Sequence, residues 1–176
     1  RADNFAKRYC HFSTNGLEFE LICLQRWFVL YDFMKHHSLF KALYLDSDIL
    51  MYDDIRLLQT KTDKYAMTVT GISAHTNFIN DRDVLGDFCE LIWNAYEDAN
   101  AIGQLADEYS EFISKYKVGG ISDMTFFSKY RIEYKERVLD LSNIREESVF
   151  DITLDTIEGY ESEGNYKKVL WKNLME

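Results

Sequence analysis

The 176-residue chain is acidic: it carries 20 Lys and Arg against 30 Asp and Glu, for a formal net charge of −10. This charge disfavours a general surface for DNA, RNA or anionic lipid, so no nucleic-acid partner is expected, and a phosphate-bearing ligand would need a metal ion. Hydrophobic residues make up 47% of the sequence, which is enough for one core. We therefore expect a single domain over residues 1–176.

The three cysteines, Cys10, Cys23 and Cys89, are odd in number and far apart, which favours reduced thiols in a reducing cytosol. No stretch approaches the ~20 apolar residues of a membrane span, and the N-terminal sequence lacks the apolar region of a signal peptide. We expect a cytoplasmic protein without a transmembrane segment, either free or peripheral at the inner membrane. Because the chain starts with Arg1, it is expected to begin within a longer gene.

The first long element is a helix predicted over residues 17–37, after a Ser/Thr/Asn cluster that is typical of a helix start. Its polar stripe consists of Glu18, Gln25 and Asp32, spaced by seven. The remaining faces are apolar, so we expect other elements to cover this helix on most sides.

The later elements alternate between strands and helices. KALYLD (residues 41–46) reads as a buried strand of a mostly parallel sheet, and YAMTVTG (residues 65–71) as a second strand that ends at Gly71. A helical turn is expected at residues 55–59, two helices over residues 81–116 with breaks near Asn100 and Gly103, a loop and short helix over residues 119–130, and strands at residues 138–142, 148–153 and 167–173. This order predicts an α/β fold.

Two aspartates stand where the first strand ends. In open α/β sheets ligands bind beyond the carboxyl ends of the strands, which is where Asp46 and Asp48 fall. Two carboxylates at i and i+2 can both reach one Mg²⁺ or Mn²⁺ ion, which keeps open positions for phosphate oxygens. The alternative is that Asp46 caps the turn while Asp48 is solvated.

The segment YLDSDILMYDDI (residues 44–55) resembles the DxD region of GT-A type glycosyltransferases, particularly relatives of glycosyltransferase family 8. There the pattern YLDxDxxxxxDI follows a helix that carries Arg or Lys, which Arg26 matches. The resemblance implies a Rossmann-like mixed, mostly parallel sheet flanked by helices. It also implies that the stretch Asp46, Ser47 and Asp48 holds Mn²⁺ or Mg²⁺ against the diphosphate of a nucleotide sugar, usually a UDP-sugar.

Arg26 also stands out by its position. Counting by three and four places it in line with Phe19, Ile22, Leu30 and Phe33, so a guanidinium emerges from an apolar stripe. A buried cation needs an anion, and Asp46, Asp48 or a bound phosphate could supply it. The alternatives are a structural salt bridge, or a stem packed on the core with its head in solvent.

A second candidate is VGGISDMTFF (residues 118–127). Paired glycines let a backbone approach a ligand closely, and Asp123 would stand at a helix N-terminus, where it could face a sugar hydroxyl or the anomeric centre. The alternative is that Ser or Asp is simply the N-cap. Family 8 relatives carry a DQD-like string where this chain has SDM. If the enzyme inverts, Asp123 is the candidate catalytic base, whereas a retaining reaction, which the resemblance favours, needs no single base.

His75 and Asn77 are expected on a loop after the second strand, at the same sheet edge as Asp48. At that edge they could contact an acceptor, and plain solvation is the alternative.

These features predict a metal-dependent glycosyltransferase of the hexosyltransferase type, which moves a sugar to a glycan or lipid-linked acceptor in surface polysaccharide synthesis. Family 8 enzymes also have a base-binding strand before the first helix and a late HxxGxxK motif with a histidine metal ligand. Neither is found here, so a partial domain lacking both ends is expected.

Two other classes of protein remain open. One is a non-catalytic module that keeps the GT-A scaffold for binding. The other is a haloacid dehalogenase-like phosphatase with Asp46 as nucleophile and Asp48 as general acid, although that family has Thr or Val where Ile49 stands.

Overall fold

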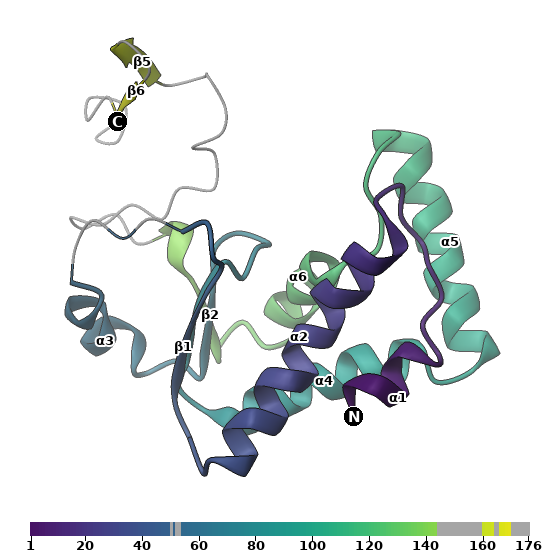
Figure 1. The fold of residues 1–176 in the computed structure, drawn as a ribbon, viewed down its shortest axis with the longest axis horizontal. Coiled ribbons are helices and arrows are strands. Elements are labelled where there is room, and N and C mark those ends of the chain that lie inside the picture. The colour runs from purple at the N-terminus through teal and green to yellow at the C-terminus, as the bar shows by residue number, and fades with distance from the viewer. Residues whose placement is uncertain (50, 52–53, 144–159, 164–165, 170–176) are drawn as a thin grey trace.

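The computed structural model describes residues 1–49, 51, 54–143, 160–163 and 166–169. Its elements alternate as an α/β chain, with a small mixed sheet that has helices on both faces (Figure 1). In chain order the elements are α1 (Ala2–Ala6), α2 (Leu17–His36), β1 (Ala42–Leu45), α3 (Arg56–Thr62), β2 (Met67–Val69), β3 (Thr76–Ile79), α4 (Arg82–Ala95), α5 (Ala99–Tyr116), α6 (Asp123–Glu133), β4 (Val138–Asp140), the 3-10 turn η1 (Leu141–Asn143), β5 (Tyr160–Glu163) and β6 (Tyr166–Val169).

The sheet has the order β1-β3-β2-β4. Because β3 runs antiparallel between β1 and β2, two of the three pairings are antiparallel, and only β2 with β4 is parallel. The expected mostly parallel sheet is therefore a mixed one. The three strands β1, β2 and β4 still run in one direction, so their carboxyl ends lie along the same edge.

Strand β3 was missed by the sequence pattern. Asn77 lies within it, fully buried and opposite Tyr44 of β1, so the loop expected at Asn77 is wrong. His75 lies in a bend just before β3, as expected. The physical reason is that Thr76 and Asn77 are polar yet buried, which hides the strand from a search for apolar runs. Strand β5, which pairs antiparallel with β6, was also not expected.

The other expected elements agree with the structure in type and differ at their boundaries. The break between α4 and α5 falls at residues 96–98, because the Asp98 side chain caps α5 by accepting from the backbone N–H groups of Asn100 and Ala101, while Gly103 lies inside α5. The strand expected at residues 148–153 lies outside the described residues, as does the end of the one expected at 167–173.

One core holds α2, α4 and α6 against one face of the sheet. An aromatic cluster forms its centre, in which Phe88 stacks on Phe127 with ring centroids 4.0 Å apart and Trp27 meets Phe127 edge-on at 4.8 Å. On the other face of the sheet, Leu58 of α3 packs with Phe78 and Leu141. The sheet is thus covered by apolar side chains on both faces.

The loop before α2 is tied to the loop before α6. The Ile121 N–H donates to Phe12 O at 2.8 Å, and Thr14 and Gly119 exchange two further hydrogen bonds. Gly120 packs directly on the backbone of Phe12 and Ser13, so its lack of a side chain serves a contact within the chain and not the approach to a ligand that the sequence suggested. This pairing places the start of α6 beside α2.

Replacing Gly120 with Ala should therefore lower the free energy of unfolding by about 1–3 kcal/mol, the range for overpacked sites. An added Cβ would lie 2.2 Å from Phe12 O and 2.4 Å from Ser13 Cα, so the two loops must separate. Urea denaturation measures the change. The matched control is Gly103→Ala in α5, where a Cβ meets nothing within 4 Å and helix propensity should give a gain of about 0.5–1 kcal/mol. Equal stability of the two variants would contradict the role of Gly120.

Candidate functional site

The candidate site begins at the carboxyl end of β1. The Asp46 N–H donates to His75 O at 2.9 Å, so the β1–β3 pairing continues one residue beyond the Leu45–Thr76 pair. Asp46 and Tyr44, two residues apart on an extended chain, lie on the same face of the sheet. The Tyr44 hydroxyl donates to Asp46 Oδ1 at 2.6 Å. The end of β1 thus presents the Asp46 carboxylate, which accepts a hydrogen bond from Tyr44 of the same strand.

Arg26 of α2 joins this strand end to the start of α6. Its Nη1 donates to Asp46 Oδ1 at 2.8 Å and to the Tyr44 hydroxyl at 2.9 Å, and its Nη2 donates to Asp123 Oδ2 at 2.5 Å. The same Asp123 oxygen accepts from Trp27 Nε1 at 3.0 Å. We call these five residues, Arg26, Trp27, Tyr44, Asp46 and Asp123, the Arg26 cluster.

The cluster lies at the boundary between core and solvent. The side chain of Asp123 is 5% exposed, whereas those of Arg26 and Asp46 are 27% and 25% exposed. Burial alone would lower the pKa of Arg26, but the charge of Asp123 and the hydrogen bond to it raise that pKa above its ordinary value. Burial and the hydrogen bond to Asp46 raise the pKa of Tyr44, so its hydroxyl remains a donor at neutral pH.

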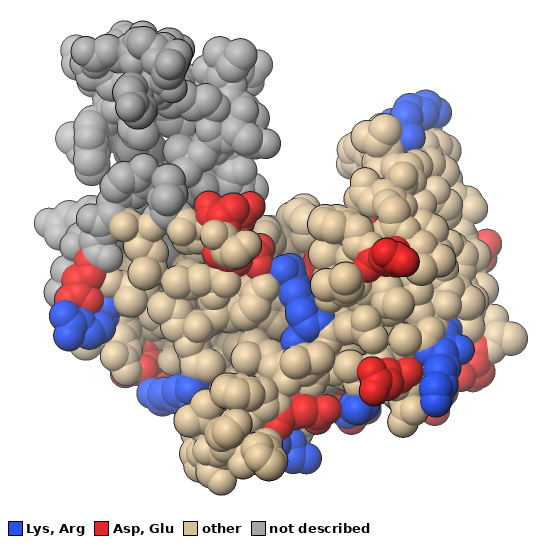
Figure 2. Space-filling model, viewed as in Figure 1, with Lys and Arg blue, Asp and Glu red and all other residues tan. Residues whose placement is uncertain are grey.

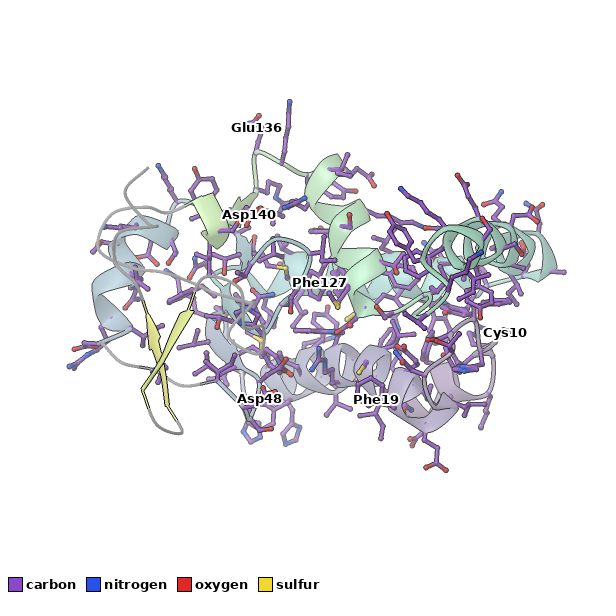
Figure 3. All side chains as sticks on the ribbon, turned by 90° about the horizontal axis from the view of Figure 1, so that it is seen from above. Cys10, Phe19, Asp48, Phe127, Glu136 and Asp140 are labelled. Carbon is purple, nitrogen blue, oxygen red and sulfur yellow. The ribbon has the colours of Figure 1, made fainter. Side chains whose placement is uncertain are left out.

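Of the DxD stretch, Asp46 to Asp48, only Asp46 belongs to the Arg26 cluster. Ser47 and Asp48 are exposed, and Asp48 lies on the side of the molecule where α2 and Phe19 are found (Figure 3). All described hydrogen bonds to the Asp46 carboxylate go to Oδ1. Oδ2 of Asp46 and the carboxylate of Asp48 are hard oxygen donors next to solvent, which suits Mg²⁺ or Mn²⁺ with water or phosphate in the other positions. Within the described part of the chain, no three His, Cys, Asp or Glu side chains are grouped to hold a metal ion.

Asp123 is the first residue of α6, and Ser122 is the N-cap. Thr125 Oγ1 accepts from the Ser122 N–H at 3.2 Å, which helps to satisfy the helix start. The Asp123 carboxylate is instead bound by Arg26 and Trp27, so it is not the cap. Asp123 thus connects α6 to α2, and Arg26 extends this connection to the end of β1.

Sequence reasoning missed Tyr44, Trp27 and the polar atoms of β3. Tyr44 could have been found, because a residue two before Asp46 on a strand shares its face. His75 lies opposite Asp46, and burial lowers its pKa while Asp46 and Asp48 oppose that shift. Arg26 Nε, His75 Nε2 and both amide atoms of Asn77 are buried without a partner among the described residues, a costly arrangement unless water or a ligand binds them.

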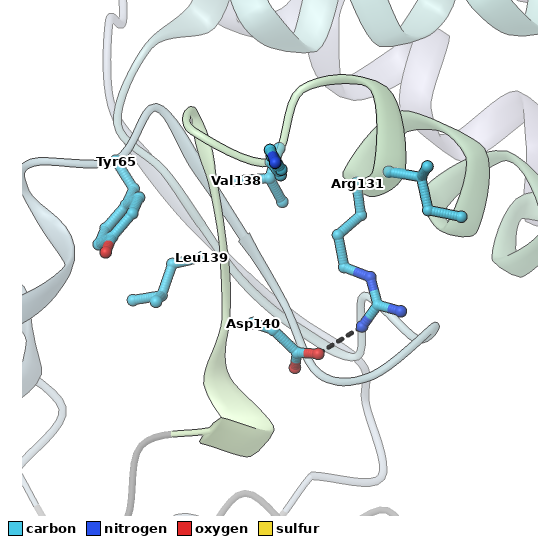
Figure 4. Close-up of a pocket in the computed structure, with 7 residues that line it drawn as sticks. Tyr65, Arg131, Val138, Leu139 and Asp140 are labelled. Atoms are coloured by element: carbon cyan, nitrogen blue, oxygen red, sulfur yellow. Dashed lines mark hydrogen bonds and ion pairs between the residues drawn. The ribbon is translucent and has the colours of Figure 1, made fainter.

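A shallow pocket of about 480 Å³ lies at β4 and contains none of the cluster residues. Figure 4 shows Arg131 and Asp140 in this pocket, joined by an ion pair. Asp140 also accepts from the Gly71 N–H at 2.8 Å, and from the N–H and hydroxyl of Ser142 at 3.0 and 2.7 Å. The carboxylate thereby holds the turn after β2 at the carboxyl edge of the sheet.

The comparisons with known proteins found no match to any family model, curated protein or solved structure. No helix in the described part of the chain is long and apolar enough to cross a membrane. The resemblance to the DxD glycosyltransferases therefore remains an expectation, and the GT-A fold is not established by the mixed sheet alone.

Replacing Arg26 with Met should leave two carboxylates without their cation. We expect a loss of about 2 kcal/mol in the free energy of unfolding at pH 7, below the ~3–5 kcal/mol of a fully buried pair because two of the three side chains are partly exposed. Urea denaturation at pH 7 measures the loss.

Arg56→Met is the control for this variant, because the Arg56–Asp54 ion pair is at the surface and should contribute little to stability. If Arg26→Met destabilises the protein no more than Arg56→Met, the cluster does not stabilise the fold.

Replacing Asp140 with Asn tests the role of the Asp140 carboxylate, which holds the turn after β2. Burial opposes its ionisation, but the hydrogen bonds from Gly71 and Ser142 and the charge of Arg131 outweigh burial and lower the pKa of Asp140 below its ordinary 3.8. Because the folded-state pKa is the lower one, its stabilising contribution is complete above about pH 4 and is lost as the pH falls through the folded-state value. The stability difference between wild type and Asp140→Asn should therefore vanish in acid. Exposed Asp107 in α5 supplies the control, Asp107→Asn, which should change the free energy of unfolding at neutral pH far less than Asp140→Asn does.

Proposed function

We propose that this chain belongs to a metal-dependent glycosyltransferase that transfers a hexosyl group from a nucleotide sugar, typically a UDP-sugar, to a glycan or lipid-linked acceptor. The observation that supports the proposal is the Arg26 cluster, in which Arg26 joins Asp46 to Asp123, two residues 77 positions apart in sequence (123 − 46). Three residues singled out by the sequence pattern meet at the carboxyl end of one strand, where α/β proteins bind ligands.

The charges of the cluster support the metal requirement. One guanidinium faces two carboxylates, so the cluster carries a net charge of −1, and Asp48 adds a further negative charge beside it. A diphosphate would be repelled by this site as it stands. Mg²⁺ or Mn²⁺ at Asp46 Oδ2 and Asp48 would neutralise the local charge and offer open positions to phosphate oxygens.

In the proposed reaction the bond between the anomeric carbon and the diphosphate oxygen breaks, and a bond from that carbon to an acceptor oxygen forms while the acceptor hydroxyl loses its proton. Negative charge grows on the departing diphosphate, and Arg26 is a fixed cation that is bound to Asp46 at the β1 end. Asp123 holds the guanidinium in place through Nη2. In an inverting enzyme Asp123 would be the base, whereas a retaining reaction leaves it this positioning role.

The proposed setting is the cytoplasm, with synthesis of a surface polysaccharide as the process. A UDP-sugar made in the cytoplasm would be the donor, and an acceptor held at the inner membrane would bring the enzyme there as a peripheral protein. The acidic surface does not favour attachment by anionic lipid, so the acceptor itself would provide the membrane contact.

Calorimetric titration of UDP with and without Mn²⁺ tests the site. We expect binding that requires the metal and falls at least tenfold in Asp48→Asn, since the substitution removes a charged metal ligand without removing a contact of the fold. Asp107→Asn on α5 is the matched control and should bind as wild type does.

A second step separates catalysis from binding alone. Metal-dependent UDP binding without release of UDP from a panel of UDP-sugars and acceptors would favour the non-catalytic module. Absence of UDP binding by a chain that gives a cooperative unfolding transition would overturn the proposal, and phosphate release from a phosphate ester that is lost in Asp46→Asn would favour the phosphatase.

A further inference from the structure

The outer face of α2 carries an apolar stripe that the described residues leave uncovered. The exposed fractions of Phe19, Ile22, Val29 and Phe33 are 62%, 62%, 56% and 51%. This corrects the expectation that α2 is covered on most sides, because the core packs against its other face through Leu24, Trp27, Phe28 and Met34. Isolated exposed apolar residues are common, but four in a row on one helix mark an interaction surface.

The stripe has the spacing of a helix-pairing seam. Phe19, Ile22, Arg26, Val29 and Phe33 are separated by alternating steps of three and four, the a and d positions of two heptads. Arg26 turns its guanidinium into the cluster, so only its aliphatic stem belongs to the seam. From Phe19 to Phe33 the seam is roughly 21 Å long at 1.5 Å per residue. That length fits about four turns of a partner helix.

The charges that border the seam are acidic. Glu18 and Asp32 are exposed on α2 along one side. Asp32 makes a 3.5 Å contact with the N-terminal ammonium of Arg1. Figure 2, drawn from the side where α2 lies, shows a mostly uncharged surface over this helix, with basic side-chain atoms near its middle and acidic side chains among those around it.

We propose that this seam, together with Glu18 and Asp32, is the docking surface for an amphipathic helix of another protein that carries Lys or Arg beside its apolar stripe. A helix in a groove is recognised through anchors at i, i+3, i+4 and i+7, which the seam offers. A second copy of this chain is disfavoured, because its own acidic borders would meet those of the first. Anionic membrane is disfavoured by the same charges.

The probe is a 21-residue designed helix with Leu at a and d and Lys at e and g, labelled for fluorescence anisotropy. We expect it to bind at least tenfold more tightly than a matched peptide with Glu at e and g. Ile22→Asp should weaken binding at least tenfold. The control is Ile132→Asp on α6, a residue that is 71% exposed outside the seam and whose substitution should leave the affinity unchanged.

Charge reversal distinguishes a built surface from general attraction to an acidic protein. Glu18→Lys should weaken the Lys peptide several-fold and strengthen the Glu peptide, whereas Glu111→Lys on α5 should change neither. Circular dichroism verifies that each variant is folded.

Several outcomes would overturn the proposal. These are no binding of the Lys peptide, equal affinity for the two peptides, or equal effects of Ile22→Asp and Ile132→Asp. In sedimentation, a dimer dissolved by Ile22→Asp would instead assign the seam to pairing between copies. Binding to neutral phosphatidylcholine vesicles that is lost in Ile22→Asp would assign it to lipid.

Discussion

One guanidinium shared by two carboxylates organises the candidate site. Arg26 binds Asp46 at the end of β1 and Asp123 at the start of α6, and it supplies the positive charge that both carboxylates face. The supporting contacts are of two kinds. Tyr44 and Trp27 donate to the same two oxygens that Arg26 uses, and the loop pairing around Gly120 brings α6 next to α2. The ion pairs, the hydrogen bonds from Tyr44 and Trp27, and the loop pairing around Gly120 thus all support the arrangement around Arg26.

The topology of the mixed sheet determines which residues lie beside the Arg26 cluster. Since β3 returns between β1 and β2, the residue opposite Asp46 is His75, and a row of buried polar groups continues along β3 to Asn77. A purely parallel sheet would have put another strand end beside Asp46. Asp140 also stabilises this edge of the sheet, where its three hydrogen bonds and its ion pair with Arg131 hold the turn after β2.

The sequence pattern predicted those elements whose signals lie within a few residues of one another. The α2 helix, the β1 strand and the importance of Arg26 could be read from the sequence, because an apolar period, an abrupt polar end and a cation in an apolar stripe are visible within a few residues. The pairing of Arg26 with Asp123 could not, since it joins residues 97 apart through a fold that no short pattern encodes. Buried Thr76 and Asn77 concealed β3, and the apolar surface of α2 suggested a cover that the described residues do not provide.

The indole of Trp27 turns the cluster into an optical reporter. Its Nε1–H donates to the Asp123 oxygen that also binds Arg26, and the ring is fully buried 4.7 Å from the ring of Tyr44. Any ligand or ion that draws Arg26 away from Asp123 changes the field at this indole and thus the wavelength of its emission. The emission wavelength of Trp27 therefore reports on binding at the Arg26 cluster.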